Sequence, residues 1–124
     1  PWAQHAYVGR RASSGTQPAP VDAAEAGDLE VVHAVDHALR ARGCPKRIWI
    51  TETGTFDHRC AGMAAALGGW AHDPRVDAAF QYTFREDSSY PVGLADPALR
   101  EAYGAYRAWR AFAGPSGPPH RPCA

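Results

Sequence analysis

The residues of this 124-residue chain that could carry out chemistry follow short apolar runs. Glu52 stands next to the end of the run Ile-Trp-Ile-Thr-Glu-Thr, His5 and Tyr7 stand near the start of the chain, and Tyr82 lies in a third run. A carboxylate after a row of β-branched and aromatic residues needs a partner or a function, because an unpaired buried charge costs free energy. An ionised carboxylate can act as a nucleophile or as a general base.

Strand periodicity predicts which of these side chains point the same way. With a period of two, Ile48, Ile50 and Glu52 share one face of a strand, and His5 and Tyr7 share one face of another. We therefore expect the carboxylate to end an inward row that is otherwise apolar.

Strand-like and helix-like segments alternate along the chain. Runs rich in β-branched and aromatic residues predict strands at 2–8, 47–53 and 76–84. Apolar residues at helical spacing predict three helices: one from Asp28 to Gly43, one around 63–70, and one with Asp96 as N-cap, Pro97 at its first position and Gly114 at its end. Strands that alternate with helices predict an α/β fold with a parallel sheet.

Three βα units are too few to protect both edges of a parallel sheet, so the sheet must continue elsewhere. A complete (β/α)8 barrel has about 250 residues, and three of its eight units take about 95. No Gly-rich phosphate loop follows any strand, which weighs against an open, doubly wound sheet. We predict a partial barrel domain over 1–113 and a Pro/Gly-rich tail or linker, expected to be disordered, over 114–124. The chain begins at Pro1 on a strand-like run, and we expect it to be a piece of a longer protein.

These residues together resemble the clan A retaining glycoside hydrolases, and the cellulase-like family 5 most closely. The matching pieces are His5-Ala6-Tyr7, the segment from Ile48 to Gly54, and the stretch around Tyr82. The resemblance implies that the chain is the C-terminal three βα units, strands six to eight, of a TIM (β/α)8 barrel. It also implies that Glu52 is the catalytic nucleophile.

The same resemblance implies roles for the neighbours of Glu52. Tyr7 would donate a hydrogen bond to Glu52, His5 would be a subsite residue, and Tyr82 would stack on the sugar. Gln81 is a further substrate-binding candidate at the end of the third strand, and Arg85 lies in a polar stretch that either binds sugar hydroxyls or forms a solvated loop.

The resemblance further implies hydrolysis of O-glycosidic bonds in a β-linked oligo- or polysaccharide by double displacement. Retaining hydrolysis needs two carboxylates about 5 to 5.5 Å apart, a nucleophile and a general acid. The acid of this family stands on strand four, so the missing N-terminal strands would supply it and this chain alone would be inactive. No cofactor or metal is implied, and secretion is expected. Two alternatives stay open: a non-catalytic carbohydrate-binding or scaffolding barrel, and a barrel in which Glu52 is a general base on a carbonyl substrate.

Composition excludes several other classes. Thirteen Lys and Arg balance thirteen Asp and Glu, so no nucleic-acid footprint is present. No apolar run approaches the roughly 20 residues of a membrane helix. A neutral sugar is compatible with this balance.

Cysteine and histidine positions give weaker signals. Three cysteines are an odd number, so at least one is unpaired within this stretch. His33 and His37 stand four apart on a predicted helix, but a solvated helix face is the favoured interpretation, because Ala34 stands where a zinc protease has Glu. Cys44 and Cys60 flank a strand some 20 Å long, which argues against a disulfide or a shared metal between them.

Overall fold

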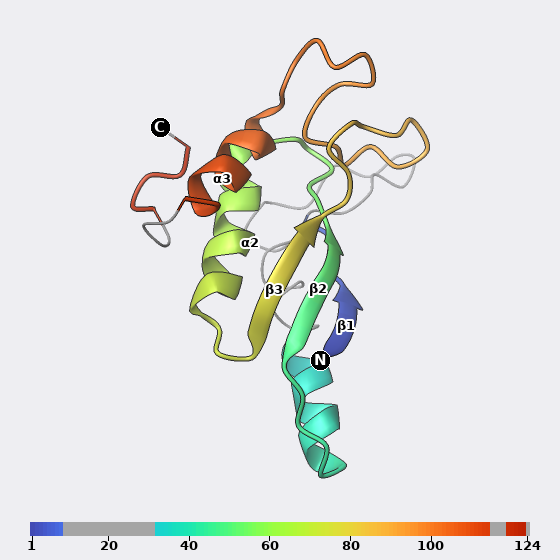
Figure 1. Cartoon of the computed structure of the whole chain (residues 1–124), viewed down its shortest axis with the longest axis vertical. Coiled ribbons are helices and arrows are strands. Elements are labelled where there is room, and N and C mark those ends of the chain that lie inside the picture. Colours follow the sequence, from blue (N-terminus) through green and yellow to red (C-terminus); the bar gives the residue numbers. More distant parts are fainter. Residues whose placement is uncertain (9–31, 115–118, 124) are drawn as a thin grey trace, which may run out of the picture.

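Three parallel strands alternate with helices in the computed structural model, which describes residues 1–8, 32–114 and 119–123. The strands form one sheet in the order β1-β2-β3, with α2 and α3 beside it (Figure 1). The bounds are Trp2–His5 for β1, Ile48–Thr53 for β2, Cys60–His72 for α2, Val76–Gln81 for β3 and Gly104–Phe112 for α3. The predicted α/β fold with a parallel sheet is therefore confirmed, as a small open sheet.

A further helix precedes β2 and occupies residues 32–41 of the described chain. Gly43, which follows it, has φ of 66°, the left-handed conformation that commonly ends a helix at glycine. This end agrees with the prediction. The predicted N-cap, Asp28, lies outside the described residues.

The last helix begins later than the sequence predicts. The Asp96–Pro97 pair does not start a helix; α3 starts at Gly104. The carboxylate of Asp96 instead accepts hydrogen bonds from the backbone N–H groups of Arg100 and Glu101, at 2.5 and 2.8 Å. Leu99, which lies between Asp96 and Arg100, has φ of 58°, a left-handed conformation that interrupts a helix. The Asp96 side chain therefore caps a separate turn that precedes α3.

The helices cover one face of the sheet. Ile48 and Ile50 of β2 are completely buried there, in one cluster with Met63, Leu67 and Trp70 of α2. Val32 of the first helix belongs to the same cluster. Burial of such apolar side chains is the main stabilising contribution to this layer, at roughly 1.5 to 3 kcal/mol for each one.

A bulge in β2 turns Glu52 away from this core. Gln4 of β1 lies opposite Ile50, and the next residue, His5, lies opposite Glu52, so Thr51 is an extra residue on β2. One extra residue moves the following side chain to the other face of the sheet. The prediction that Ile50 and Glu52 share a face is therefore wrong: Ile50 points to the helices and Glu52 to the open face.

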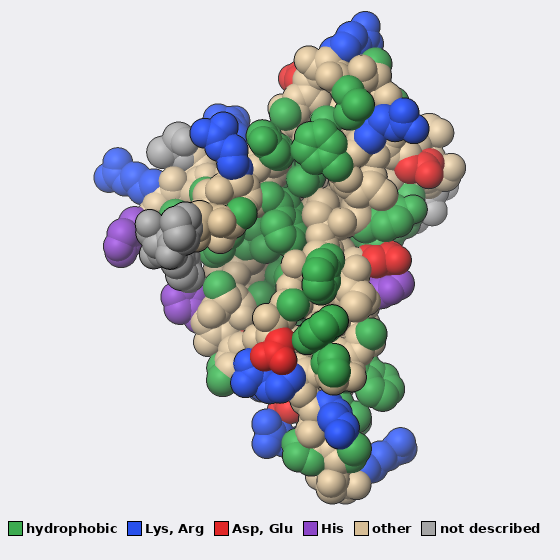
Figure 2. All heavy atoms as spheres, viewed as in Figure 1, with side chains coloured by type: hydrophobic (Ala, Val, Ile, Leu, Met, Phe, Trp, Pro, Cys, Tyr) green, Lys and Arg blue, Asp and Glu red, His purple; other side chains and the backbone are tan. Residues whose placement is uncertain are grey.

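The open face carries exposed aromatic side chains. Trp49 is 40% exposed and Phe80 is 47% exposed, and their ring centroids lie 6.0 Å apart. Figure 2 shows hydrophobic side chains gathered over the strands on this face. Within the described residues, β1 and β3 each have one edge without a neighbouring strand.

A disulfide joins Cys60, at the start of α2, to Cys123, and Cys44 is free and exposed. The bond holds residue 123 of the predicted tail beside the helical layer. None of the helices in the described parts of the chain is long and apolar enough to cross a membrane.

The open apolar face predicts that this chain, expressed alone, does not form a stable monomer. Exposed aromatics and two unpaired strand edges favour association with other chains. Sedimentation of the purified chain should show oligomers, and replacing Trp49 and Phe80 with Lys should reduce their mass. A monomeric sample with a cooperative thermal transition would contradict this prediction.

Candidate active site

A pocket of about 310 Å³ opens at the C-terminal ends of the strands. Its lining residues come from all three βα units: His5, Tyr7, Glu52, Tyr82 and Tyr90. The volume lies at the lower end of the range found for small-molecule sites, about 300 to 1,000 Å³. In parallel α/β folds, reactive side chains concentrate at this end of the strands.

Glu52 is the centre of the pocket. The Tyr7 hydroxyl donates a hydrogen bond of 2.7 Å to its Oε2 atom. His5 Nδ1 lies 3.3 Å from the same oxygen. The Glu52 side chain is 35% exposed, so the carboxylate has two protein neighbours and remains open to a ligand. The structure brings Glu52, Tyr7 and His5 together, as the sequence predicts.

The protein environment keeps Tyr7 in its protonated form. Partial burial is the largest cause that raises the pKa of Tyr7, and the hydrogen bond to Glu52 and the charge of Glu52 raise it further. Tyr7 is therefore a neutral hydrogen-bond donor throughout the physiological pH range.

Two further tyrosines form the aromatic part of the pocket. Tyr82 follows β3, and its backbone N–H donates to Thr53 O at 2.7 Å, which fixes it beside β2. Gln81 pairs with Thr53 on the helix-covered face, so the next side chain, Tyr82, belongs to the open face with Glu52. The predicted position of Tyr82 beside Glu52 agrees with this arrangement.

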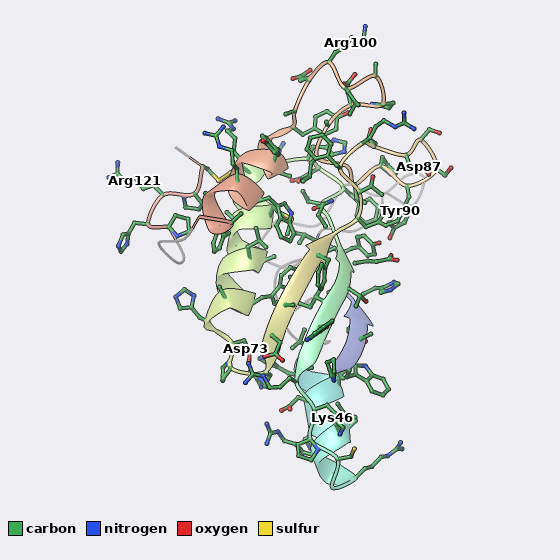
Figure 3. All side chains as sticks on the ribbon, in the orientation of Figure 1. Lys46, Asp73, Asp87, Tyr90, Arg100 and Arg121 are labelled. Carbon is green, nitrogen blue, oxygen red and sulfur yellow. A yellow bond between two sulfur atoms is a disulfide. The ribbon has the colours of Figure 1, made fainter. Side chains whose placement is uncertain are left out.

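Tyr90 was not among the residues that the sequence singled out. It comes from the loop between β3 and α3 and lies near the C-terminal ends of the strands (Figure 3). Its ring meets that of Tyr7 edge-on, with centroids 5.0 Å apart, and that of Tyr82 at 6.3 Å. An aromatic residue within an otherwise polar loop was the available signal, but only tertiary contacts show that it faces the pocket.

Gln81 is not brought into the pocket. Its side chain accepts a hydrogen bond from Trp109 Nε1 at 2.7 Å and donates one to Val92 O, also at 2.7 Å. These bonds join β3 to α3 and to the following loop. The geometry thus gives Gln81 a structural role in place of the predicted contact with substrate.

Arg85 is not brought into the pocket either. It lines a separate polar hollow of about 580 Å³ with Thr83, Glu86, Asp87 and Ser88 of the same loop, and with Pro97. The predicted contact between Arg85 and a ligand beside Glu52 is therefore not seen.

The histidine motif of the first helix lies at the other end of the sheet. His33 Nε2 is 3.2 Å from Asp73, which precedes β3 and also accepts hydrogen bonds from Arg75. The bond from Arg75 is the largest cause that lowers the pKa of Asp73, to about 2. Within the described residues, no group of three or more His, Cys, Asp or Glu side chains could hold a metal ion.

Compared with known protein families, curated proteins and solved structures, the chain matches none of them. A function for the pocket therefore has to be inferred from its residues and their geometry.

The raised pKa of Tyr7 predicts its behaviour in alkaline titration. An ordinary tyrosine ionises at about pH 10, and Tyr7 should ionise only at higher pH. The absorbance difference between the protein and its Tyr7→Phe variant should therefore appear at higher pH than the main phenolate transition. In a Glu52→Gln background the Tyr7 signal should appear at a lower pH than in the wild type but still above the main transition, because the charge is lost while the burial stays in place. A Tyr7 signal within the main transition would contradict the hydrogen-bonded geometry.

Proposed function

We propose that this chain is the C-terminal three-eighths of a (β/α)8-barrel glycoside hydrolase, with Glu52 as its nucleophile. The three parallel units would be strands six to eight, as in the clan A enzymes that the sequence resembles. The reaction would be hydrolysis of a β-linked oligo- or polysaccharide with net retention, through a covalent glycosyl-enzyme intermediate.

The observation that carries the proposal is the contact of Tyr7 and His5 with one oxygen of Glu52, at 2.7 and 3.3 Å. A nucleophilic carboxylate must be ionised and held in one orientation. The Tyr7 hydroxyl fixes one oxygen of Glu52 by its hydrogen bond, while the other remains available for attack on the anomeric carbon.

Aromatic side chains beside a carboxylate suit a neutral sugar. The faces of Tyr82 and Tyr90 can contact the apolar C–H surface of a pyranose ring, and hydroxyl groups of the pocket can pair with sugar hydroxyls. Among the described residues that line the pocket there is no Lys or Arg, which supports an uncharged ligand.

The pocket holds one half of the catalytic pair. Glu52 is the only carboxylate among its described lining residues, and retention needs a second one about 5 to 5.5 Å away. In this proposal the general acid stands on strand four, in the N-terminal part of the barrel. Those strands would also cover the open face around Trp49 and Phe80.

Secretion is part of the proposal. The disulfide between Cys60 and Cys123 supports it, because structural disulfides persist mainly in oxidising compartments. The exposed thiol of Cys44 does not bear on this point.

Replacing Glu52 with Gln in the intact protein should lower kcat on an aryl β-glycoside by on the order of a thousandfold or more, because an amide cannot form the glycosyl ester. The far-ultraviolet spectrum and the melting temperature should stay close to those of the wild type, since the two side chains are nearly isosteric.

Glu101→Gln, at an exposed position outside the pocket, is the matched control and should keep wild-type turnover. Turnover by Glu52→Gln within a few-fold of the wild type would refute the nucleophile. If the wild type and Glu52→Gln both bind the sugar and neither hydrolyses it, the result would instead support a non-catalytic carbohydrate-binding barrel.

Tyr7→Phe in the intact protein should lower kcat on an aryl β-glycoside about fivefold. The lost hydrogen bond contributes about 1 kcal/mol net, and without it one oxygen of Glu52 is no longer held in place. Steady-state kinetics of both proteins on one aryl glycoside test this, and an unchanged kcat would exclude a catalytic role for the Tyr7 hydrogen bond.

A further inference from the structure

Two loops meet at the rim of the Glu52 pocket. The loop between β2 and α2 carries Phe56, and the loop between β3 and α3 carries Tyr90. The rings of these two residues meet edge-on with centroids 5.2 Å apart, and both contact the ring of Tyr7. The position of Tyr90 relative to Glu52 therefore depends on how the two loops are joined.

A pair of largely covered side chains joins them. His58 Nε2 of the first loop contacts Glu86 Oε2 of the second, and the two side chains are 26% and 12% exposed. Apart from each other, these two buried atoms have no hydrogen-bond partner in the described part of the chain. Because an unpaired buried carboxylate is costly, each group depends on the other.

Tyr103 completes the cluster from the residue before α3. Its hydroxyl lies 3.3 Å from Glu86 Oε1, to which it donates a hydrogen bond, and its ring stacks on that of His58, with centroids 4.1 Å apart and planes 20° apart. We refer to His58, Glu86 and Tyr103 as the rim clamp. It fixes both oxygens of Glu86 and one face of the His58 ring.

Two features of the backbone, at His58 and at Gly93, accompany the rim clamp. His58 has φ of 57°, a left-handed conformation that residues with a side chain seldom adopt. Gly93, on the return of the second loop, lies so close to Glu86 that a β-carbon there would stand 2.5 Å from the Glu86 Cα atom. The loop that carries Tyr90 is thus folded directly onto the residue that the clamp fixes.

We infer that the rim clamp positions Tyr90 as a wall of the Glu52 pocket and thereby sets the affinity for the sugar unit bound there. The inference rests on the proposed glycosidase function, which it deepens. His58, Glu86 and Tyr103 are outside the pocket lining, so they are positioning residues and act through Tyr90.

The main test compares Glu86→Ala, Tyr90→Ala and the double variant in the intact protein. Each single variant should raise KM on a neutral aryl β-glycoside about tenfold and change kcat by less than about twofold, since a lost wall weakens ground-state and transition-state binding alike. The double variant should be no worse than Tyr90→Ala, because the two residues act through one contact. Multiplied effects in the double variant would overturn the inference.

Asp73→Asn provides a matched control for general destabilisation. It breaks another charged cluster, around Asp73, which is only 5% exposed, at the opposite end of the sheet. It should lower the melting temperature yet leave KM unchanged. An equal rise of KM in Asp73→Asn and Glu86→Ala would show that the rim clamp contributes only stability.

Hydrogen exchange tests the inference without relying on activity. The amide of Tyr90 donates to Asp87 O at 3.1 Å, and that of Val92 donates to Tyr90 O at 2.9 Å. Glu86→Ala should speed exchange across residues 85–95 and 54–59, whereas Asp73→Asn should not. If the wild type hydrolyses no glycoside, the proposed function fails, and unchanged exchange in Glu86→Ala would still refute the rim clamp separately.

Discussion

The site depends on one extra residue in β2. The bulge at Thr51 lets Ile48 and Ile50 pack on the helices while Glu52 turns to the open face. Without it, strict alternation would direct a carboxylate into the apolar layer between sheet and helices, where an unpaired charge is unfavourable. With the bulge, the carboxylate contacts Tyr7, and Ile48 and Ile50 remain packed in the core. Bulges recur near functional sites because they redirect a side chain at little cost to the rest of the sheet.

The neighbours of Glu52 come from segments far apart in sequence but adjacent at the ends of parallel strands. Tyr7 supplies a neutral donor that its own burial keeps protonated. Tyr82 and Tyr90 supply aromatic surface, and the loops behind them are tied together by His58 and Glu86. Backbone hydrogen bonds that continue the pairing of β1 with β2 therefore hold Tyr7 beside Glu52, while the aromatic wall depends on loop packing.

Features that follow from local pattern could be predicted from the sequence, and those that follow from pairing between distant segments could not. β-branched and aromatic runs located all three strands, and the resemblance to retaining glycoside hydrolases implied the grouping of His5, Tyr7 and Glu52. The bulge in β2 could not be predicted, because the register of a strand is set by its pairing with the neighbouring strand. Asp96 looked like an N-cap because its carboxylate does bind backbone N–H groups, but those of a turn. The contacts of Gln81 and Tyr90 depend on tertiary packing in the same way, and no local motif marks them.

The disulfide between Cys60 and Cys123 makes a covalent ring of the second half of the chain. The ring contains α2, β3, the loop with Tyr90, and α3. A peptide bond cut by a protease in that loop would open the ring without dividing the molecule, and the two pieces would separate only after reduction. A cut in the loop that forms the pocket wall would thus leave both of its flanking elements, β3 and α3, attached to one another.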